Sequence, residues 1–301
     1  MAMNLAVFPH TSISSILSEA DWEDRQREHI IRIDALFGSY FDRRMRGQKH
    51  PVIDFLFEYY SFRPALLKRW SPGAQVGIET SKVPKVFGKQ ACAKDGVFWL
   101  NPADFPDQRR EGLRWAIDVL TNTAARQPAF GCAGMHEWAM VYKATDEQIR
   151  HRKTPLRLPQ SEIDAFVESR PVVCSHFDAF RFFTDPARPL NKLQPEHKLI
   201  PALEQPGCLH ANMDLYKWAY KFYPWVGSDL ITDALELALK ARRTDMEASP
   251  YDLINYGLNP ILIETEAGRE EYRQRQMEIW QLGIPVRERL IEALEILTLE
   301  S

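Results

Sequence analysis

The chain has 301 residues, of which 45% are hydrophobic and 26% are charged, as is ordinary for a soluble globular protein. Its formal net charge of −3 at pH 7 argues against broad, nonspecific binding to DNA. No run of about 18 apolar residues occurs, so we expect no membrane-spanning helix.

The cysteines point to a reducing compartment. Cys92, Cys132, Cys174 and Cys208 stand far apart, and no CxxC pair occurs among them. A zinc ribbon or a redox dithiol is therefore not expected. The first residues lack a basic region followed by a long apolar core, which argues against a secretory signal. We expect free thiols and a cytoplasmic protein.

The first half of the chain alternates helical patterns with one β-rich stretch. Residues 1–18 show no regular pattern, whereas apolar residues recur at helical spacing among the charges of residues 19–46. A dense aromatic run follows in residues 50–70. Residues 75–101 contain short runs rich in β-formers, and a Lys-Asp-Gly turn at residues 94–96 resembles a hairpin connection, so we expect a small insert of two or three strands. A helix is predicted again at residues 108–125.

The second half reads as mostly helical, apart from residues 171–183, which start as a strand-like run that could end at His176. We expect the final helix to break near residues 283–285, where a glycine and a proline occur. The predicted helices lie at residues 161–168, 208–221, 229–243 and 267–299. The fold prediction is therefore mainly α: a single helical domain over residues 1–301, with a small β-hairpin insert at residues 75–101.

The stretch at residues 204–221 carries the most unusual pattern. In a helix that starts at about Cys208, the residues Leu209, Met213, Tyr216 and Tyr220 share one face. The neighbouring face carries an imidazole, a carboxylate and an ammonium at the same spacing. These three side chains are His210, Asp214 and Lys217. The row is either a solvated edge or the wall of a catalytic or ligand-binding cleft.

Two further segments share the same composition of small residues, a histidine, a nearby carboxylate and aromatic residues. In the first, His136 and Glu137 precede Trp138; in the second, His176 lies two residues before Asp178, on the same side if the segment is a strand. If the three segments converge, their histidines lie within about 10 Å of one another around one pocket. Such a site suits general acid–base chemistry or a transition metal.

Several familiar signatures are absent. The His136-Glu137 pair is half of the HExxH zinc motif, but Met140 stands where its second histidine belongs. The sequence contains no GxGxxG after a strand, no Walker A loop, no GxSxG elbow and no zinc deaminase signature.

Four segments resemble the hallmark stretches of a bacterial family labelled "3-methyladenine DNA glycosylase". They read HPVIDFLFEYYSFRP, GMHEWAMVYK, SHFDAFRFF and EQPGCLHANMDLYKWAYK, and the resemblance extends from about residue 51 to residue 271. The helix-hairpin-helix of known alkyl-base glycosylases is absent. The resemblance implies hydrolysis of an N-glycosidic bond to a nucleobase, and a role in DNA repair.

On this hypothesis Asp214 activates water or stabilises the oxocarbenium-like centre, while His210 or His136 protonates the leaving base. Glu137 belongs to the same catalytic group. Aromatic residues would stack on the base and polar residues would bind the substrate. The stacking residues are Tyr216, Trp218 and Trp138, and the other binding residues are His176, Asp178, Asn212 and Lys217. The substrate is a small molecule or contains a nucleobase, and the net charge does not favour contact with DNA.

Two alternatives remain open. The spacing of His210, Asp214 and Lys217 resembles the HxxxDxxH helix of haem-oxygenase-like di-iron oxidases, with lysine at the last ligand position. A metal-dependent oxygenase or hydrolase would bind Fe or Zn through imidazoles and carboxylates. Its ligands would be His136, Glu137, His176, His210 and Asp214. The second alternative is a noncatalytic protein that binds a small planar ligand.

Overall fold

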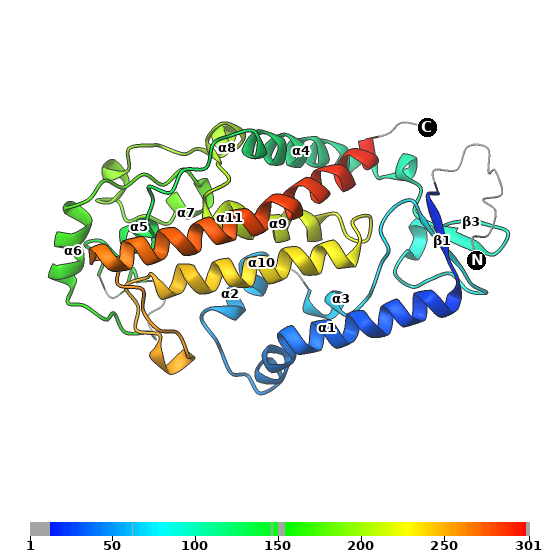
Figure 1. The fold of residues 1–301 in the computed structure, drawn as a ribbon, viewed down its shortest axis with the longest axis horizontal. Coiled ribbons are helices and arrows are strands. Elements are labelled where there is room, and N and C mark those ends of the chain that lie inside the picture. Colours follow the sequence, from blue (N-terminus) through cyan, green and yellow to red (C-terminus); the bar gives the residue numbers. More distant parts are fainter. Residues whose placement is uncertain (1–12, 62, 146, 150–153, 299–301) are drawn as a thin grey trace.

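The computed structural model describes residues 13–298 apart from 62, 146 and 150–153. Long helices run along the longest axis of the molecule, and a small sheet lies at one end (Figure 1). The mainly α prediction is confirmed: eleven α-helices and one four-stranded sheet form in the described part of the chain. No described helix is long and apolar enough to cross a membrane.

Three helices form the centre of the fold. The helix α9 (Leu209–Lys221) packs against α10 (Ser228–Glu247) and α11 (Glu266–Glu295), and α4 (Arg110–Ala124) covers the other side of α11. Every residue of α9 except its two last lysines, Lys217 and Lys221, is buried. Of the two expectations for its charged row, the solvated edge is therefore wrong, because His210 and Asp214 are buried.

The helix α11 does not break at residues 283–285, so that prediction is wrong. The helix continues through Pro285, which has no backbone N–H to donate to the carbonyl of Gln281. Both residues are exposed, so water can satisfy that carbonyl. Gly283 instead allows α11 to approach α9, because a Cβ atom there would lie 2.2 Å from Asn212 Oδ1.

The predicted β insert at residues 75–101 forms as three strands, and a fourth strand from residues 15–17 joins its sheet. The strands β3 (Cys92–Lys94) and β4 (Val97–Trp99) form the hairpin, and β2 (Val76–Glu79) pairs with β4 in antiparallel fashion. The strand β1 (Ser15–Leu17) adds a parallel partner to β2. The expectation that residues 1–18 are irregular is therefore wrong for Ser15–Leu17, which form a strand only by pairing with the distant β2. Residues 1–12 lie outside the described residues.

The remaining helices surround this centre. The first helix, α1, begins at the predicted residue and lies along α10. The strand-like run at residues 171–183 forms no strand; its backbone is extended to His176 and then turns into a short helix. His176 and Asp178 therefore do not share a strand face. The bounds are α1 Glu19–Met45, α2 Ile53–Glu58, α3 Pro64–Leu67, α5 Met135–Ala139, α6 Gln160–Glu168, α7 Phe177–Phe180 and α8 Ile200–Leu203.

Candidate acid–base site

The three histidine segments come together, as predicted, but their histidines do not all line one pocket: His136 and His176 line different ones, and His210 lines both. His136 lies in α5, His176 immediately precedes α7, and His210 lies in the first turn of α9. The ring centroids of His136 and His210 are 4.6 Å apart, and those of His176 and His210 are 5.2 Å apart. His210 is therefore the central imidazole of the three.

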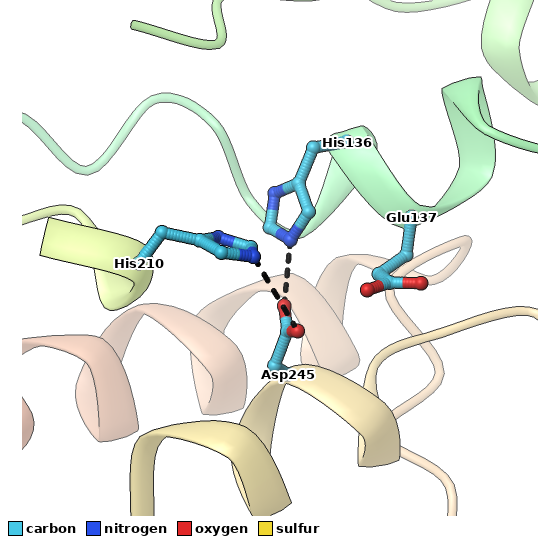
Figure 2. A group of neighbouring side chains, drawn as sticks. All are labelled: His136, Glu137, His210 and Asp245. Atoms are coloured by element: carbon cyan, nitrogen blue, oxygen red, sulfur yellow. Dashed lines mark hydrogen bonds and ion pairs between the residues drawn. The ribbon is translucent and has the colours of Figure 1, made fainter. Parts of the chain in front are cut away.

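On one side of His210 lies a group of charged residues centred on Asp245 of α10 (Figure 2). Its Oδ1 atom lies 2.6 Å from His136 Nε2, and its Oδ2 atom accepts a 2.8 Å hydrogen bond from Arg242 Nη1. The same Arg242 nitrogen lies 3.2 Å from Glu137 Oε1. His210 Nε2 is 4.0 Å from Asp245 Oδ2, too far for a hydrogen bond.

These contacts set the charge states of the Asp245 group. Burial alone would lower the pKa of His136, but Asp245 and Cys132 raise it well above the ordinary value. Burial lowers the pKa of His210 well below the ordinary value, and the neighbouring His136 and His176 lower it further. Burial raises the pKa of Glu137, with the charge of Asp245 adding to the effect. At neutral pH the arrangement thus favours a protonated His136 and a neutral His210.

A second group of charged residues lies on the other side of His210. His176 Nδ1 is 3.1 Å from Glu204 Oε1, close enough for an ion pair although not aligned as a hydrogen bond. His176 Nε2 is 3.8 Å from Asp214 Oδ2. Asp214 also accepts a 2.9 Å hydrogen bond from the Tyr60 hydroxyl and forms an ion pair with Lys217. Only 1% of Asp214 is exposed, so these partners replace its hydration.

The carboxylates of this second group favour cationic neighbours. Burial would lower the pKa of His176, but Glu204, and to a smaller extent Asp214, raise it above the ordinary value. Burial would likewise lower the pKa of Lys217, which Asp214 and Glu204 raise instead. His176 and Lys217 together balance the charges of Glu204 and Asp214.

Each group contains enough ligand atoms for a metal ion. The potential ligand atoms of His136, Glu137, His210 and Asp245 lie within 4.8 Å of one another, and so do those of His176, Glu204 and Asp214. However, Arg242 and Lys217 already pair with the carboxylates of the two groups. A divalent ion would have to displace those cations and remove protons from His136 and His176.

A pocket opens onto both groups. Glu137, His176, His210, Asp214 and Arg242 lie at its buried floor. Its mouth is formed by half-buried side chains, namely Phe55, Tyr59, Met140, Asp178 and Phe182. The cavity measures about 30 Å³, which is room for one or two water molecules. The pocket therefore has a narrow interior lined by charged side chains and a mouth lined largely by aromatic rings.

Several predicted site residues lie outside this pocket. Trp138 donates its indole N–H to the Ala248 carbonyl, and Tyr216 packs against Tyr60 and Tyr220. The ring of Trp218 lies beneath Lys217 and Lys221. None of these three predicted stacking residues lines the pocket, so the aromatic walls at its mouth take that place.

Asn212 has a structural environment rather than a binding one. Its amide group donates to the carbonyls of Pro206 and Cys208, and its oxygen accepts from Arg287. His136 does not line this pocket and lines a different cavity instead. Asp178 lies at the pocket mouth, where its carboxylate is 3.7 Å from Lys217 Nζ.

Sequence reasoning missed Glu204, Tyr60, Arg242 and Asp245. A signal for the last two was present, because Leu235, Ala238, Arg242 and Asp245 follow helical spacing. Charged residues that continue an apolar stripe are candidates for a buried site. Glu204 and Tyr60 gave no comparable signal, since neither belongs to a regular pattern.

No family model, no curated protein and no solved structure matches this chain. The proposals that follow therefore rest on the geometry of the site and on the resemblance of the four segments quoted above.

Proposed function

We propose that this protein is a hydrolase that cleaves an N-glycosidic bond to a nucleobase by general acid–base catalysis. One observation carries the proposal: two imidazoles face the same pocket, and their surroundings favour opposite protonation states. His176 is held as a cation by Glu204 and Asp214, and His210 is held neutral by burial. Such separation of two titratable groups assigns one as acid and the other as base.

The proposed roles follow from these charge states. His176 donates its proton to the departing base, in place of the His210 or His136 expected from the sequence. His210 accepts a proton from the attacking water, for which the floor of the pocket has room. Asp214 lies 3.8 Å from His176 and stabilises positive charge on the sugar as the bond breaks.

The pocket mouth suits a flat substrate. Phe55 and Tyr59 stack with a centroid separation of 4.7 Å and an interplanar angle of 6°, and Phe182 packs edge-on against Tyr59. A base that lay against these rings would gain about 1–3 kcal/mol per stacking contact. The cavity is smaller than a base, so the proposal requires these half-buried rings to turn on binding. Asp178, which also pairs with Arg181, would accept a hydrogen bond from an amino group of the base.

The test is base release measured by chromatography. The protein is incubated with alkylated DNA, unmodified DNA and a panel of free nucleosides, and each substrate is also given to His176→Gln and His210→Gln variants. Turnover should fall at least about a hundredfold in both, the scale of a lost acid or base. His197→Gln is the matched control, because His197 is exposed and absent from the pocket lining. Equal turnover in all variants contradicts the assignment.

The metal-dependent alternative has one specific observation in its favour, the compact sets of ligand atoms around His210. Its test is elemental analysis of protein produced with added iron and zinc. One bound equivalent that is lost in His210→Ala would support the metal enzyme. Less than about a tenth of an equivalent would remove it. Tight binding of a base or nucleoside without any turnover would instead support a noncatalytic binding protein.

The cytoplasmic location also stays a proposal. It is supported by the four cysteines, all of which are free thiols, as expected in a reducing compartment.

A further inference from the structure

A second cavity adjoins the acid–base pocket, and among the described residues His210 alone lines both. We call it the Gln276 cavity, after a glutamine in its wall. It measures about 240 Å³, against about 30 Å³ for the acid–base pocket. An engineered cavity of about 150 Å³ is already large enough to bind benzene. The Gln276 cavity therefore has room for a molecule of one substituted ring or two fused rings, and the acid–base mechanism does not use this space.

The wall of the Gln276 cavity contains a hydrogen-bond acceptor without a partner. Gln276 is 1% exposed, and its Nε2 atom donates a 2.6 Å hydrogen bond to the Gly207 carbonyl. Since only the amide nitrogen can donate to a carbonyl, the other atom of the group is the oxygen. No described residue donates a hydrogen bond to this Oε1 atom. A buried acceptor without a donor is costly, so a donor on a bound molecule would be favourable there.

A second glutamine in the same wall shows the contrast. Gln205 Oε1 accepts hydrogen bonds from the backbone N–H groups of Ala129 and Gly207, and its Nε2 donates to the Ala129 carbonyl. Both ends of the Gln205 amide are therefore satisfied within the chain, whereas only one end of the Gln276 amide is.

Two hydroxyl groups add to the polar part of the wall. Ser175 and Tyr272 line the cavity, and within the described part of the chain neither side chain forms a hydrogen bond. A hydroxyl group can donate or accept. Much of the remaining wall is aliphatic, and those residues are Val173, Leu193, Leu203 and Leu209. Apolar walls with a few polar groups are typical of sites for small molecules.

The cavity offers no partner to a charged ligand. The described residues that line it include no Asp, Glu, Lys or Arg. His136 already uses both ring nitrogens within the protein, because Nε2 lies 2.6 Å from Asp245 Oδ1 and Nδ1 lies 3.3 Å from Cys132 Sγ. A buried charge without a partner is strongly unfavourable. The ligand that suits this cavity is therefore neutral.

We propose that the Gln276 cavity binds a small, neutral heterocycle that donates an N–H group to Gln276 Oε1. A ring nitrogen of the same molecule would accept a hydrogen bond from the hydroxyl of Ser175 or Tyr272, and its carbon atoms would pack against the aliphatic side chains. The proposal is separate from the hydrolase function, because it concerns a different cavity and requires no turnover.

The experiment compares two isomeric probes by isothermal titration calorimetry at pH 8, where both are neutral. 2-Methylbenzimidazole has one N–H donor and one acceptor nitrogen, whereas 1-methylbenzimidazole has the same size and the acceptor but no N–H group. We expect the first to bind with a Kd below about 1 mM. The second should bind at least about fivefold more weakly, because it leaves the buried acceptor unpaired.

Alkylation of the cysteines by iodoacetamide, mapped by mass spectrometry, locates the bound probe. Cys132 lines the cavity and is partly exposed, so 2-methylbenzimidazole should slow its alkylation in proportion to the occupancy of the site. Cys92 is the internal control. It is also partly exposed, but it lies on β3 and does not line the cavity, so its rate should stay unchanged.

A substitution that fills the cavity gives a second test of location. Val173→Phe adds bulk to the wall and should abolish binding of 2-methylbenzimidazole. Val83→Phe is the matched control, because Val83 is 50% exposed and lies outside the lining. Phe55→Ala reports on the acid–base pocket, whose mouth Phe55 forms, and should leave binding unchanged.

Four results would overturn the proposal. They are equal affinity for the two isomers, no binding of either isomer up to about 1 mM, unchanged alkylation of Cys132 at saturating probe, and loss of binding in Phe55→Ala rather than in Val173→Phe. The isomers and the alkylation are measured on the wild-type protein, so the question is decided whether or not any variant folds.

Discussion

The imidazole rings of His176 and His210 stack at a centroid separation of 5.2 Å with an interplanar angle of 26°, and their surroundings drive them to opposite charge states. His176 has the carboxylates of Glu204 and Asp214 beside it. His210 is 4.0 Å from the nearest oxygen of Asp245. The pKa values of two chemically identical side chains in one pocket are thereby shifted in opposite directions.

The first prediction concerns the pH dependence of base release. The pKa of His176 is raised, so the acid is lost only as the pH rises through a value above 6.5. The pKa of His210 is lowered, so the base is lost only as the pH falls well below 6.5. We expect a plateau around neutral pH with a fall on each side. His176→Gln should lower the plateau and remove its alkaline limb, which initial rates from pH 4 to pH 10 would reveal.

The second prediction concerns Asp214. Replacing it with Asn should abolish turnover and also destabilise the fold by about 3–5 kcal/mol, because Lys217 loses its buried counter-charge. Urea unfolding and base release are to be measured on the same preparations.

A double variant separates the two effects of Asp214. The double variant Asp214→Asn with Lys217→Met removes both charges of the pair, so no unpaired charge of that pair stays buried. Most of the lost stability should therefore return. Turnover should stay absent, because the carboxylate is still missing. Recovery of turnover together with stability would show that Asp214 acts only through the fold.

The third prediction concerns Arg242, which is 1% exposed and pairs with Glu137 and Asp245. Arg242→Met should cost about 3–5 kcal/mol at pH 8, because two buried carboxylates lose their shared cation. The pKa of Glu137 is already raised by burial and should rise further in the variant. Protonation of Glu137 then stabilises the folded state, so the deficit should shrink as the pH falls from 8 to 5. A deficit independent of pH in urea unfolding would argue against this charge model.

The fourth prediction concerns the contact between α9 and α11. Gly283→Ala places a methyl group 2.2 Å from Asn212 Oδ1, an atom that Arg287 also holds. Overpacking of this kind costs about 1–3 kcal/mol. Gly112→Ala in α4 is the matched control, because nothing lies within 4 Å of its added Cβ atom. It should stabilise the protein by about 0.4–1 kcal/mol. Thermal unfolding of the two variants measures the difference.

The local sequence pattern predicted the positions of the helices well, but it did not predict which segments pack against them. Residues 19–46 and the start at Cys208 were clear because apolar spacing and turn residues are local signals. The strand β1 and the continuity of α11 through Pro285 depend on distant partners and on solvent, which no local pattern contains. Sequence reasoning could not tell that α9 is enclosed on its charged face as well.

The same division holds for the candidate site. Shared composition predicted that His136, His176 and His210 would converge. The sequence could not show which aromatic residues line the pocket. A tryptophan or tyrosine such as Trp138 or Tyr216 looks the same in the sequence whether it faces a pocket or is buried in the core. Asp245 was overlooked because it stands alone in a helix, without a neighbouring histidine in the sequence.

The enclosure of α9 by its neighbours has a consequence for local opening of the structure. His210 and Asp214 lie on this buried helix, whose amides can exchange with solvent only when the packing against α10 and α11 is lost. His176 lies instead on a loop before a short helix, and the pocket rings come from short segments near the surface. We therefore expect the amides of His210 and Asp214 to exchange with the slowest unit of the protein, whereas the segment of His176 can open without global unfolding.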